Sequence, residues 1–175
     1  MPKYVVKKGK SYWPSKEMKK IAWITDPGFH KEAEKNPVKF WENLANEGIK
    51  WEKPWTKAYE EKLPYFKWFE GGKLNFSVNA LDRHLENENK TALIWVPEPQ
   101  NEKTIKLTYG ELFEKVNKCA NMLKKLGVKK GDVVSIYLPL VPELVISMLA
   151  CTRLGAAHTV VFSAFAPNAL QARIQ

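Results

Sequence analysis

The stretch Val133–Phe162, VVSIYLPLVPELVISMLACTRLGAAHTVVF, decides the fold class that the sequence predicts. Val133–Leu138 is a nearly continuous apolar run, which is typical of a parallel strand buried on both faces. Pro142 opens a helical stretch and Gly155 closes it, because proline suits the first turn of a helix and glycine its left-handed end. A second apolar run covers Ala156–Phe162. A strand, a helix and a strand in this order predict a parallel crossover and therefore an α/β fold.

The best-specified helix of the chain lies just before this unit. Thr108-Tyr109-Gly110-Glu111 is a capping box, in which the Thr hydroxyl and the Glu carboxylate each satisfy a free backbone amide. Apolar residues then recur at helical spacing from Leu112 to Leu126. Gly127 is predicted to end the helix in a left-handed conformation.

Further towards the amino terminus, residues 92–96 and 104–107 predict two strands of a β-hairpin. The polar turn Pro97–Glu102 joins them. Before the hairpin, Ser77 is predicted to cap a short helix. The apolar face of that helix would consist of Val78, Leu81 and Leu85.

The first part of the chain is rich in aromatic residues and less regular. Of the 21 aromatic residues, 15 lie at or before Phe76. One clear helix is predicted there, with Asn36 as its cap, Pro37 at its first position and Gly48 after its end. One face of this helix is predicted to be buried. This face and the tryptophans of the first part are expected to pack against a larger part of the protein. The residues of this buried stripe are Trp41, Leu44 and Ala45.

Composition excludes several classes of protein. Apolar residues make up 45% and charged residues 27%, which is typical of a globular protein. No apolar run is long enough to span a membrane, and the lysine-rich start lacks the apolar core of a secretory signal. Cys119 and Cys151 cannot build a disulfide scaffold, so a reducing, cytoplasmic compartment is expected.

The net charge of +9 is concentrated at the amino terminus. Residues 1–20 contain seven lysines and one glutamate, a net charge of +6. We interpret them as a solvated basic tail, and an anion-binding arm stays the alternative. The opposite end holds a helix that begins near Pro167 and still continues at Gln175. Because a two-stranded parallel unit leaves its edges uncovered, we expect the α/β domain to extend beyond this chain.

Few residues carry an obvious chemistry. The three histidines have no carboxylate or cysteine near them in the sequence at the spacing of metal ligands. Both cysteines lie in helices that are predicted to be buried. The Gly71–Gly72 pair suits a tight turn better than a phosphate loop. The stretch Phe162–Pro167 is more suggestive, because it follows a parallel strand, where ligands of open α/β sheets bind.

Two runs, Trp68–Asn75 (WFEGGKLN) and Asn79–His84 (NALDRH), resemble the amino-terminal region of AMP-forming acetyl-CoA synthetases, which are adenylate-forming ligases. The resemblance covers about residues 24–175. Further runs follow the order of the same family: 107–112 (LTYGEL), 127–132 (GVKKGD), 138–143 (LPLVPE), 148–156 (MLACTRLGA) and 158–162 (HTVVF).

The charge distribution and the resemblance together predict a three-part organisation. Residues 1–20 form the basic tail and residues 21–76 the irregular, aromatic-rich amino-terminal segment of the family. Residues 77–175 start the α/β adenylate-forming domain, with the first β-hairpin and parallel βαβ units of its large domain. In this interpretation the domain is incomplete.

The resemblance also implies a reaction for the complete enzyme. Such enzymes use ATP and Mg2+ to convert acetate into acetyl-AMP with release of pyrophosphate, and CoA then takes the acetyl group. In the family the phosphate loop and the catalytic lysine lie later in the chain, outside residues 1–175, so the isolated chain is expected to be inactive.

The resemblance implies one ligand site within the chain. Phe162, Ser163 and Ala164 correspond to a loop near the CoA nucleotide. Ser163-Ala164 stands where the family more often has Gly-Gly or Ala-Gly. No catalytic residue and no metal ligand is expected in residues 1–175.

Several partners and alternatives follow. The expected partner is the remainder of the synthetase, in the same or a separate chain, with acetate and CoA as its substrates. No membrane partner is expected, and a nucleic-acid partner is disfavoured because no recognition motif accompanies the lysines. A related enzyme for propionate or a similar short acid is an alternative. Another is a non-catalytic interaction module that pairs through its open sheet edge.

Overall fold

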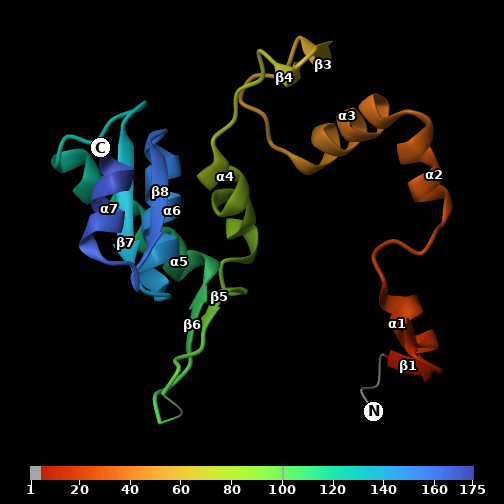
Figure 1. The fold of residues 1–175 in the computed structure, drawn as a ribbon, viewed down its shortest axis with the longest axis horizontal. Helices are drawn as coiled ribbons and strands as arrows, with labels where there is room; N and C mark the ends of the chain where they lie inside the picture. The colour runs from red at the N-terminus through yellow and green to blue at the C-terminus, as the bar shows by residue number, and fades with distance from the viewer. Residues whose placement is uncertain (1–4, 100) are drawn as a thin grey trace. The chain divides into compact units, whose positions relative to one another are not determined.

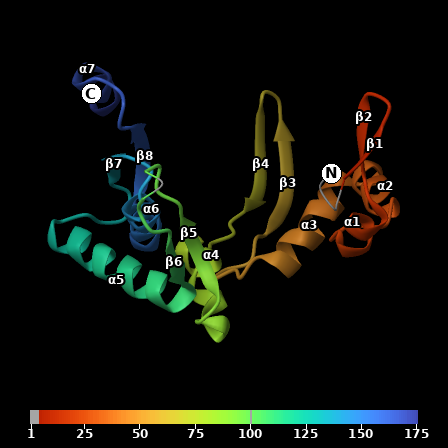
Figure 2. The same ribbon diagram turned by 90° about the horizontal axis from the view of Figure 1, so that it is seen from below.

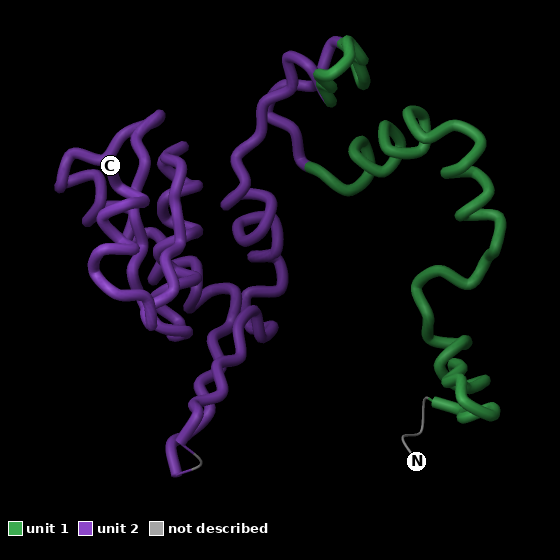
Figure 3. The backbone as a smooth tube through the Cα atoms, viewed as in Figure 1, with its two compact units in different colours: residues 1–49, 57–68 green, residues 50–56, 69–175 purple. Residues whose placement is uncertain are grey.

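A computed structural model describes residues 5–99 and 101–175, and the predicted turn Pro97–Glu102 therefore includes one residue outside the described part. The chain divides into two compact units (Figure 3). One comprises the chain up to residue 49 together with 57–68, and the other comprises 50–56 and 69–175. No described helix is both long and apolar enough to cross a membrane.

The first unit contains more regular structure than the sequence predicts. Strands β1 and β2 pair antiparallel within the predicted basic tail, and every residue of both strands is exposed. The strands β3 and β4 form a second hairpin (Figure 2). Residues 65–68 of β4 belong to the first unit and residues 69–70 to the second. The elements are β1 (Val5–Lys8), β2 (Ser11–Pro14), α1 (Lys16–Ile21), α2 (Gly28–Lys35), α3 (Pro37–Gly48), β3 (Lys57–Lys62) and β4 (Tyr65–Glu70).

Helix α3 begins where the sequence predicts. The Asn36 side chain accepts a hydrogen bond from the Lys39 amide at 3.0 Å, and Pro37 is the first helical residue. The rings of Phe29 and Phe40 meet edge to face at 4.9 Å and join α2 to α3. The predicted buried stripe is only partly correct, because Trp41 is 53% exposed. Phe40, on the side facing α2, takes the packing role instead.

The second unit begins with an aromatic cluster around a glycine turn. Trp51, Trp55 and Phe69 have ring centroids within 5.6 Å of one another. The Gly72 amide donates to the Phe69 carbonyl at 3.0 Å, and a Cβ on Gly72 would lie 2.7 Å from the Trp51 ring. Gly71 has φ +78°, which favours glycine. The prediction of a tight turn at this pair is confirmed.

The helical segment that follows is capped by a different residue from the predicted one. Helix α4 covers Phe76–Ala80, and the Asn75 side chain accepts from the Val78 amide at 3.3 Å. Ser77, the predicted cap, is instead fully buried inside the helix. A 3-10 helix, η1 (Asp82–Asn87), continues the segment. Asn caps a helix about as well as Ser, so local sequence does not decide between Asn75 and Ser77. The structure buries Ser77 and leaves the cap to Asn75.

The hairpin and the long helix after it match the predictions. Strands β5 (Thr91–Trp95) and β6 (Ile105–Thr108) pair antiparallel. Helix α5 (Tyr109–Lys125) starts with both hydrogen bonds of the Thr108–Glu111 capping box, at 3.2 Å and 2.8 Å. Gly127 follows with φ +97°.

The parallel crossover is present (Figure 1). Strand β7 (Val133–Leu138) pairs in parallel with β8 (Ala157–Phe162), in register from Val133–Ala157 to Leu138–Phe162. Helix α6 (Pro142–Leu154) connects them and ends at Gly155 with φ +72°. The last helix, α7, covers Pro167–Ile174.

The prediction that these strands are buried on both faces is wrong for the described residues. Ile136 lies in an apolar cluster with Leu144 and Cys151 of α6, but Val133 is 70% exposed. Tyr137, on the same face as Val133, is 40% exposed. Within the described chain, α6 therefore covers one face and the other face keeps apolar surface open.

The core of the second unit lies between α5 and α6. Leu112, Val116 and Ala120 of α5 form one buried cluster with Ile146 and Ala150 of α6. Half-buried residues of β5 and the completely buried Leu81 pack against the same cluster. The structure thus confirms the predicted α/β class. The three-part division at residues 20 and 76 stays a prediction.

The core position of Leu112 predicts a large effect of truncation. We expect Leu112→Ala to lower the free energy of unfolding by about 2–5 kcal/mol, because it removes buried methyl groups and leaves a cavity. Leu126→Ala makes the same change at a residue that is 74% exposed, and it should shift the value by no more than about 0.5 kcal/mol. Urea denaturation of the chain measures both. Equal losses for the two variants would contradict the assigned core.

Candidate functional site

The segment between β8 and α7 is the loop that the sequence singles out. Strand β8 ends at Phe162, and the Phe165 amide donates to the Phe162 carbonyl at 3.0 Å, which closes a turn. Ala166 then precedes Pro167, the first residue of α7. Proline suits that position because its missing amide would have no partner in the first turn. The loop therefore lies at the carboxyl end of a parallel strand, where α/β sheets bind ligands.

The backbone of this loop accommodates the side chains that are present. Ser163 and Ala164 stand where the resembled family often has glycine, yet neither has a positive φ. A backbone in the ordinary region does not need glycine. The residue types are therefore compatible with the observed turn.

Aromatic rings and a cation flank the loop. The rings of Phe162 and Phe165 meet edge to face at 6.0 Å, and both side chains are exposed. The Arg173 guanidinium lies 5.0 Å from the centre of the Phe165 ring and donates to the Ala169 carbonyl at 2.8 Å. Flat apolar rings suit a nucleotide base and a guanidinium suits phosphate, so these residues fit the chemistry of a CoA nucleotide.

One residue at the loop was missed by the sequence analysis. The Tyr137 hydroxyl on β7 lies 2.9 Å from the Ser163 carbonyl oxygen and 2.7 Å from that of Phe165. The available signal was a residue with a polar tip in a mostly apolar strand. Its partners could not be predicted, because they are 26 and 28 residues away in the sequence.

The three histidines lie beside aromatic rings or within a paired strand. The ring of His84 lies 5.0 Å from that of Tyr109, and the ring of His30 lies 5.8 Å from that of Phe29. His158 lies in β8, opposite Val134 of β7. In the described ranges, no three His, Cys, Asp or Glu side chains gather in a way that could hold a metal ion.

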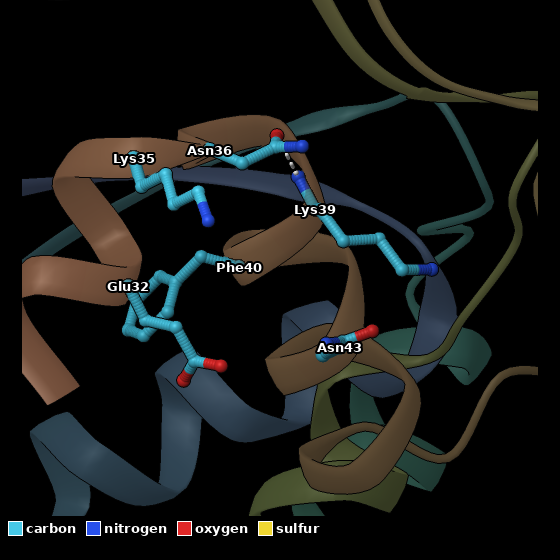
Figure 4. Close-up of a pocket in the computed structure, with 6 residues that line it drawn as sticks. All are labelled: Glu32, Lys35, Asn36, Lys39, Phe40 and Asn43. Atoms are coloured by element: carbon cyan, nitrogen blue, oxygen red, sulfur yellow. Dashed lines mark hydrogen bonds between the residues drawn. The ribbon is translucent and has the colours of Figure 1, made fainter. Parts of the chain in front are cut away.

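Two surface hollows were also not predicted. One, of about 230 Å3, lies between α2 and α3, and Figure 4 shows Glu32, Lys35 and Lys39 around Phe40. Lys39 pairs with Glu42 at 2.9 Å, and the charged groups of this hollow are all solvent-exposed. The other, of about 160 Å3, is apolar and lies where the indole of Trp95 donates to the Leu140 carbonyl at 2.7 Å. Neither contains a buried polar group that would select a ligand.

The two cysteines lie on the packed helices α5 and α6. Cys151 is completely buried, whereas Cys119 is partly exposed. Burial raises the pKa of the Cys151 thiol, and the neighbouring Cys119 thiol raises it further. A raised pKa keeps Cys151 in the unreactive thiol form at neutral pH. The interpretation of Cys151 as a core residue rather than a nucleophile agrees with this environment.

Comparison with known proteins finds two family models that together match residues 27–175. Residues 81–175 match the model of the family described as AMP-binding enzyme, and residues 27–80 match the model described as acetyl-coenzyme A synthetase N-terminus. The chain is 50% identical over 167 residues to an acetyl-coenzyme A synthetase of Gemmatimonas aurantiaca. That alignment covers 94% of this chain and 25% of the relative.

Other relatives give the same picture. An acetyl-coenzyme A synthetase of Methanothrix soehngenii is 44% identical, over 87% of this chain and 24% of the relative. A 3-hydroxypropionyl-coenzyme A synthetase of Sulfurisphaera tokodaii is 51% identical, over 83% of this chain and 22% of the relative. The solved structure of acetoacetyl-CoA synthetase from Streptomyces lividans matches with a TM-score of 0.77 and 27% identity, over 87% of this chain and 24% of that one. The chain spans about a quarter of the length of these proteins.

The environment of Cys151 predicts slow alkylation. At pH 8 iodoacetamide should modify Cys119 first and leave Cys151 largely intact, because only the thiolate reacts and burial opposes its formation. Modification of Cys151 should accelerate as the pH rises towards its raised pKa. Mass spectrometry of the chain, with Cys119→Ser to isolate the second thiol, measures the rate. In urea Cys151 should react quickly, and an equally quick reaction in the folded chain would contradict its burial.

Proposed function

The chain belongs to the AMP-binding enzyme family and matches the amino-terminal region of its acetyl-coenzyme A synthetases, and from this premise we propose that it works as part of an acetate–CoA ligase. The proposed overall reaction converts ATP, acetate and CoA into acetyl-CoA, AMP and pyrophosphate. The observation that carries the proposal is the 50% identity with an acetyl-coenzyme A synthetase over nearly the whole chain.

We assign the loop Phe162–Ala164 to the nucleotide end of CoA. Its place after a parallel strand, its exposed rings and the nearby Arg173 support this assignment. In the complete enzyme, ATP with Mg2+ would activate the carboxylate and CoA would accept the acyl group. The residues of this chain would bind and orient CoA, and we assign them no bond-making step.

The proposed partner is the remainder of the synthetase, in the same or a separate chain. The relatives are about four times as long as this chain, and apolar side chains stay open on its described surface. Val133 on the sheet and Leu140 after β7 are examples. Apolar surface of this kind favours association with another protein surface. We also propose a cytoplasmic location, which the two free cysteines support.

The proposed division of labour follows the matched segments. Residues 77–175 would start the adenylate-forming domain, and residues 21–76 would be the aromatic segment that precedes it. Residues 1–20 would be a basic extension that contains β1, β2 and all but the last residue of α1. Nothing in the proposal requires residues 1–20 to touch a substrate.

A second short acid is a specific alternative. The relative named for 3-hydroxypropionyl-coenzyme A is 51% identical to this chain, about as similar as the relative named for acetyl-coenzyme A. Identity in this region therefore does not separate the acids. A ligase for propionate, 3-hydroxypropionate or a similar acid stays the runner-up.

Completion of the chain tests the proposal. We expect the chain, produced together with the remainder of the Gemmatimonas aurantiaca relative, to form acetyl-CoA and AMP only when acetate, ATP and CoA are all present. Propionate and 3-hydroxypropionate in parallel reactions show which acids the combined protein accepts. The remainder alone is the matched control, and equal activity without this chain would contradict its contribution.

The chain alone is expected to release no pyrophosphate from ATP in response to acetate. In the resembled family the phosphate loop and the catalytic lysine lie outside the segment that matches this chain, so no residue here is assigned to that step. A coupled pyrophosphate assay on the pure chain, compared with a reaction without protein, measures the release. Acetate-dependent release above that background would disprove this expectation.

A further inference from the structure

The Tyr137 hydroxyl makes its hydrogen bonds outside its own strand, β7. The neighbouring residues on β7 are mostly apolar, and a phenylalanine ring would fill the same space. The hydroxyl instead reaches across to the loop after β8, with the Ser163 carbonyl oxygen at 2.9 Å and the Phe165 carbonyl oxygen at 2.7 Å. The single hydroxyl hydrogen is shared between these two carbonyl oxygens, so one donor orients two peptide groups of the loop.

The orientation of these carbonyls fixes that of two amides. In a trans peptide the N–H points opposite to the C=O of the same plane. The Ser163 and Phe165 carbonyls face the Tyr137 hydroxyl, so the Ala164 and Ala166 N–H groups face away from it. Within residues 5–99 and 101–175, neither amide donates a hydrogen bond that the structure shows. Both are available to an acceptor outside the protein.

We infer that Tyr137 is a positioning residue, whose hydroxyl holds the Phe162–Ala166 loop so that two amides face the CoA nucleotide. The inference rests on the proposed function, which assigns this loop to CoA. Phosphate oxygens accept hydrogen bonds from backbone amides and are repelled by carbonyl oxygens. Without the hydroxyl, the two peptide planes can turn and present carbonyl oxygen to the phosphate.

Few other described contacts hold the loop, so the Tyr137 hydroxyl can act as its anchor. Its one internal backbone hydrogen bond that the structure shows joins the Phe165 amide to the Phe162 carbonyl. Phe162, Ser163 and Phe165 are not buried, so packing constrains them little. The Tyr137 hydroxyl, whose one hydrogen the Ser163 and Phe165 carbonyls share, therefore acts directly on both of these peptide planes.

Hydrogen exchange on the 175-residue chain tests the anchor without any catalysis. Tyr137→Phe should accelerate exchange of the Phe165 amide about threefold to tenfold, the factor expected for loss of one ordinary hydrogen bond. Amides at the centre of β7 and β8 should keep their protection, which shows that the variant folds. Tyr65→Phe removes the hydroxyl of an exposed tyrosine on β4 and should change nothing in the loop. Unchanged exchange in Tyr137→Phe would overturn the inference.

Kinetics of the completed synthetase separate positioning from a merely structural role. Tyr137→Phe should raise the KM for CoA about threefold to tenfold, while the KM values for ATP and for the acid keep their wild-type values. An equal change in all three constants, or no change in the KM for CoA, would overturn the inference.

If the chain combined with the remainder of a synthetase makes no acyl-CoA, the proposed function is refuted. The role of Tyr137 can still be tested on the same protein by hydrogen exchange. CoA added to that protein should then slow exchange at Ala164 and Ala166, and Tyr137→Phe should weaken this protection. Absence of protection in the protein with Tyr137 would overturn the inference.

Discussion

The apolar seam between α5 and α6 is the contact on which the rest of the second unit depends. Leu112, Val116 and Ala120 meet Ile146 and Ala150 there, and all five are buried. Helix α4, η1 and strands β5 to β8 each touch α5 or α6. Because an apolar face is stable only when another element covers it, the seam sets where the hairpin and the parallel strands can lie. Helix α7 is held differently, since polar contacts from Tyr137 fix the loop before it.

Local signals in the sequence were sufficient for most of this architecture. The Thr108–Glu111 capping box and the left-handed glycines at 127 and 155 depend only on neighbouring residues, so they could be predicted. The choice between Ser77 and Asn75 as a cap could not, because both residues can cap and the burial of Ser77 depends on tertiary packing. The same limit explains Trp41, whose exposure depends on which side of α3 faces α2.

The candidate site was predictable in position but not in detail. Ligands of open α/β sheets bind in loops that follow parallel strands. The alternation of strand and helix in the sequence was enough to locate such a loop here. The hydroxyl of Tyr137 and the guanidinium of Arg173 reach that loop only through the fold. The exposed face of β7 was mispredicted for a related reason. A continuous apolar strand indicates that both faces become covered, and the sequence does not say which part of the protein covers each of them.

Two motifs that are far apart in the sequence meet in one polar contact. Asp82 belongs to the NALDRH run and Arg153 to the MLACTRLGA run, and they pair through two hydrogen bonds at 3.0 Å and 2.5 Å. Asn75 adds a bond to the Arg153 carbonyl at 3.1 Å, and the guanidinium lies 5.2 Å from the Phe113 ring. A partly buried, two-pronged ion pair adds little net stability but tolerates few alternative geometries. It therefore fixes how the segment before the hairpin docks on α6.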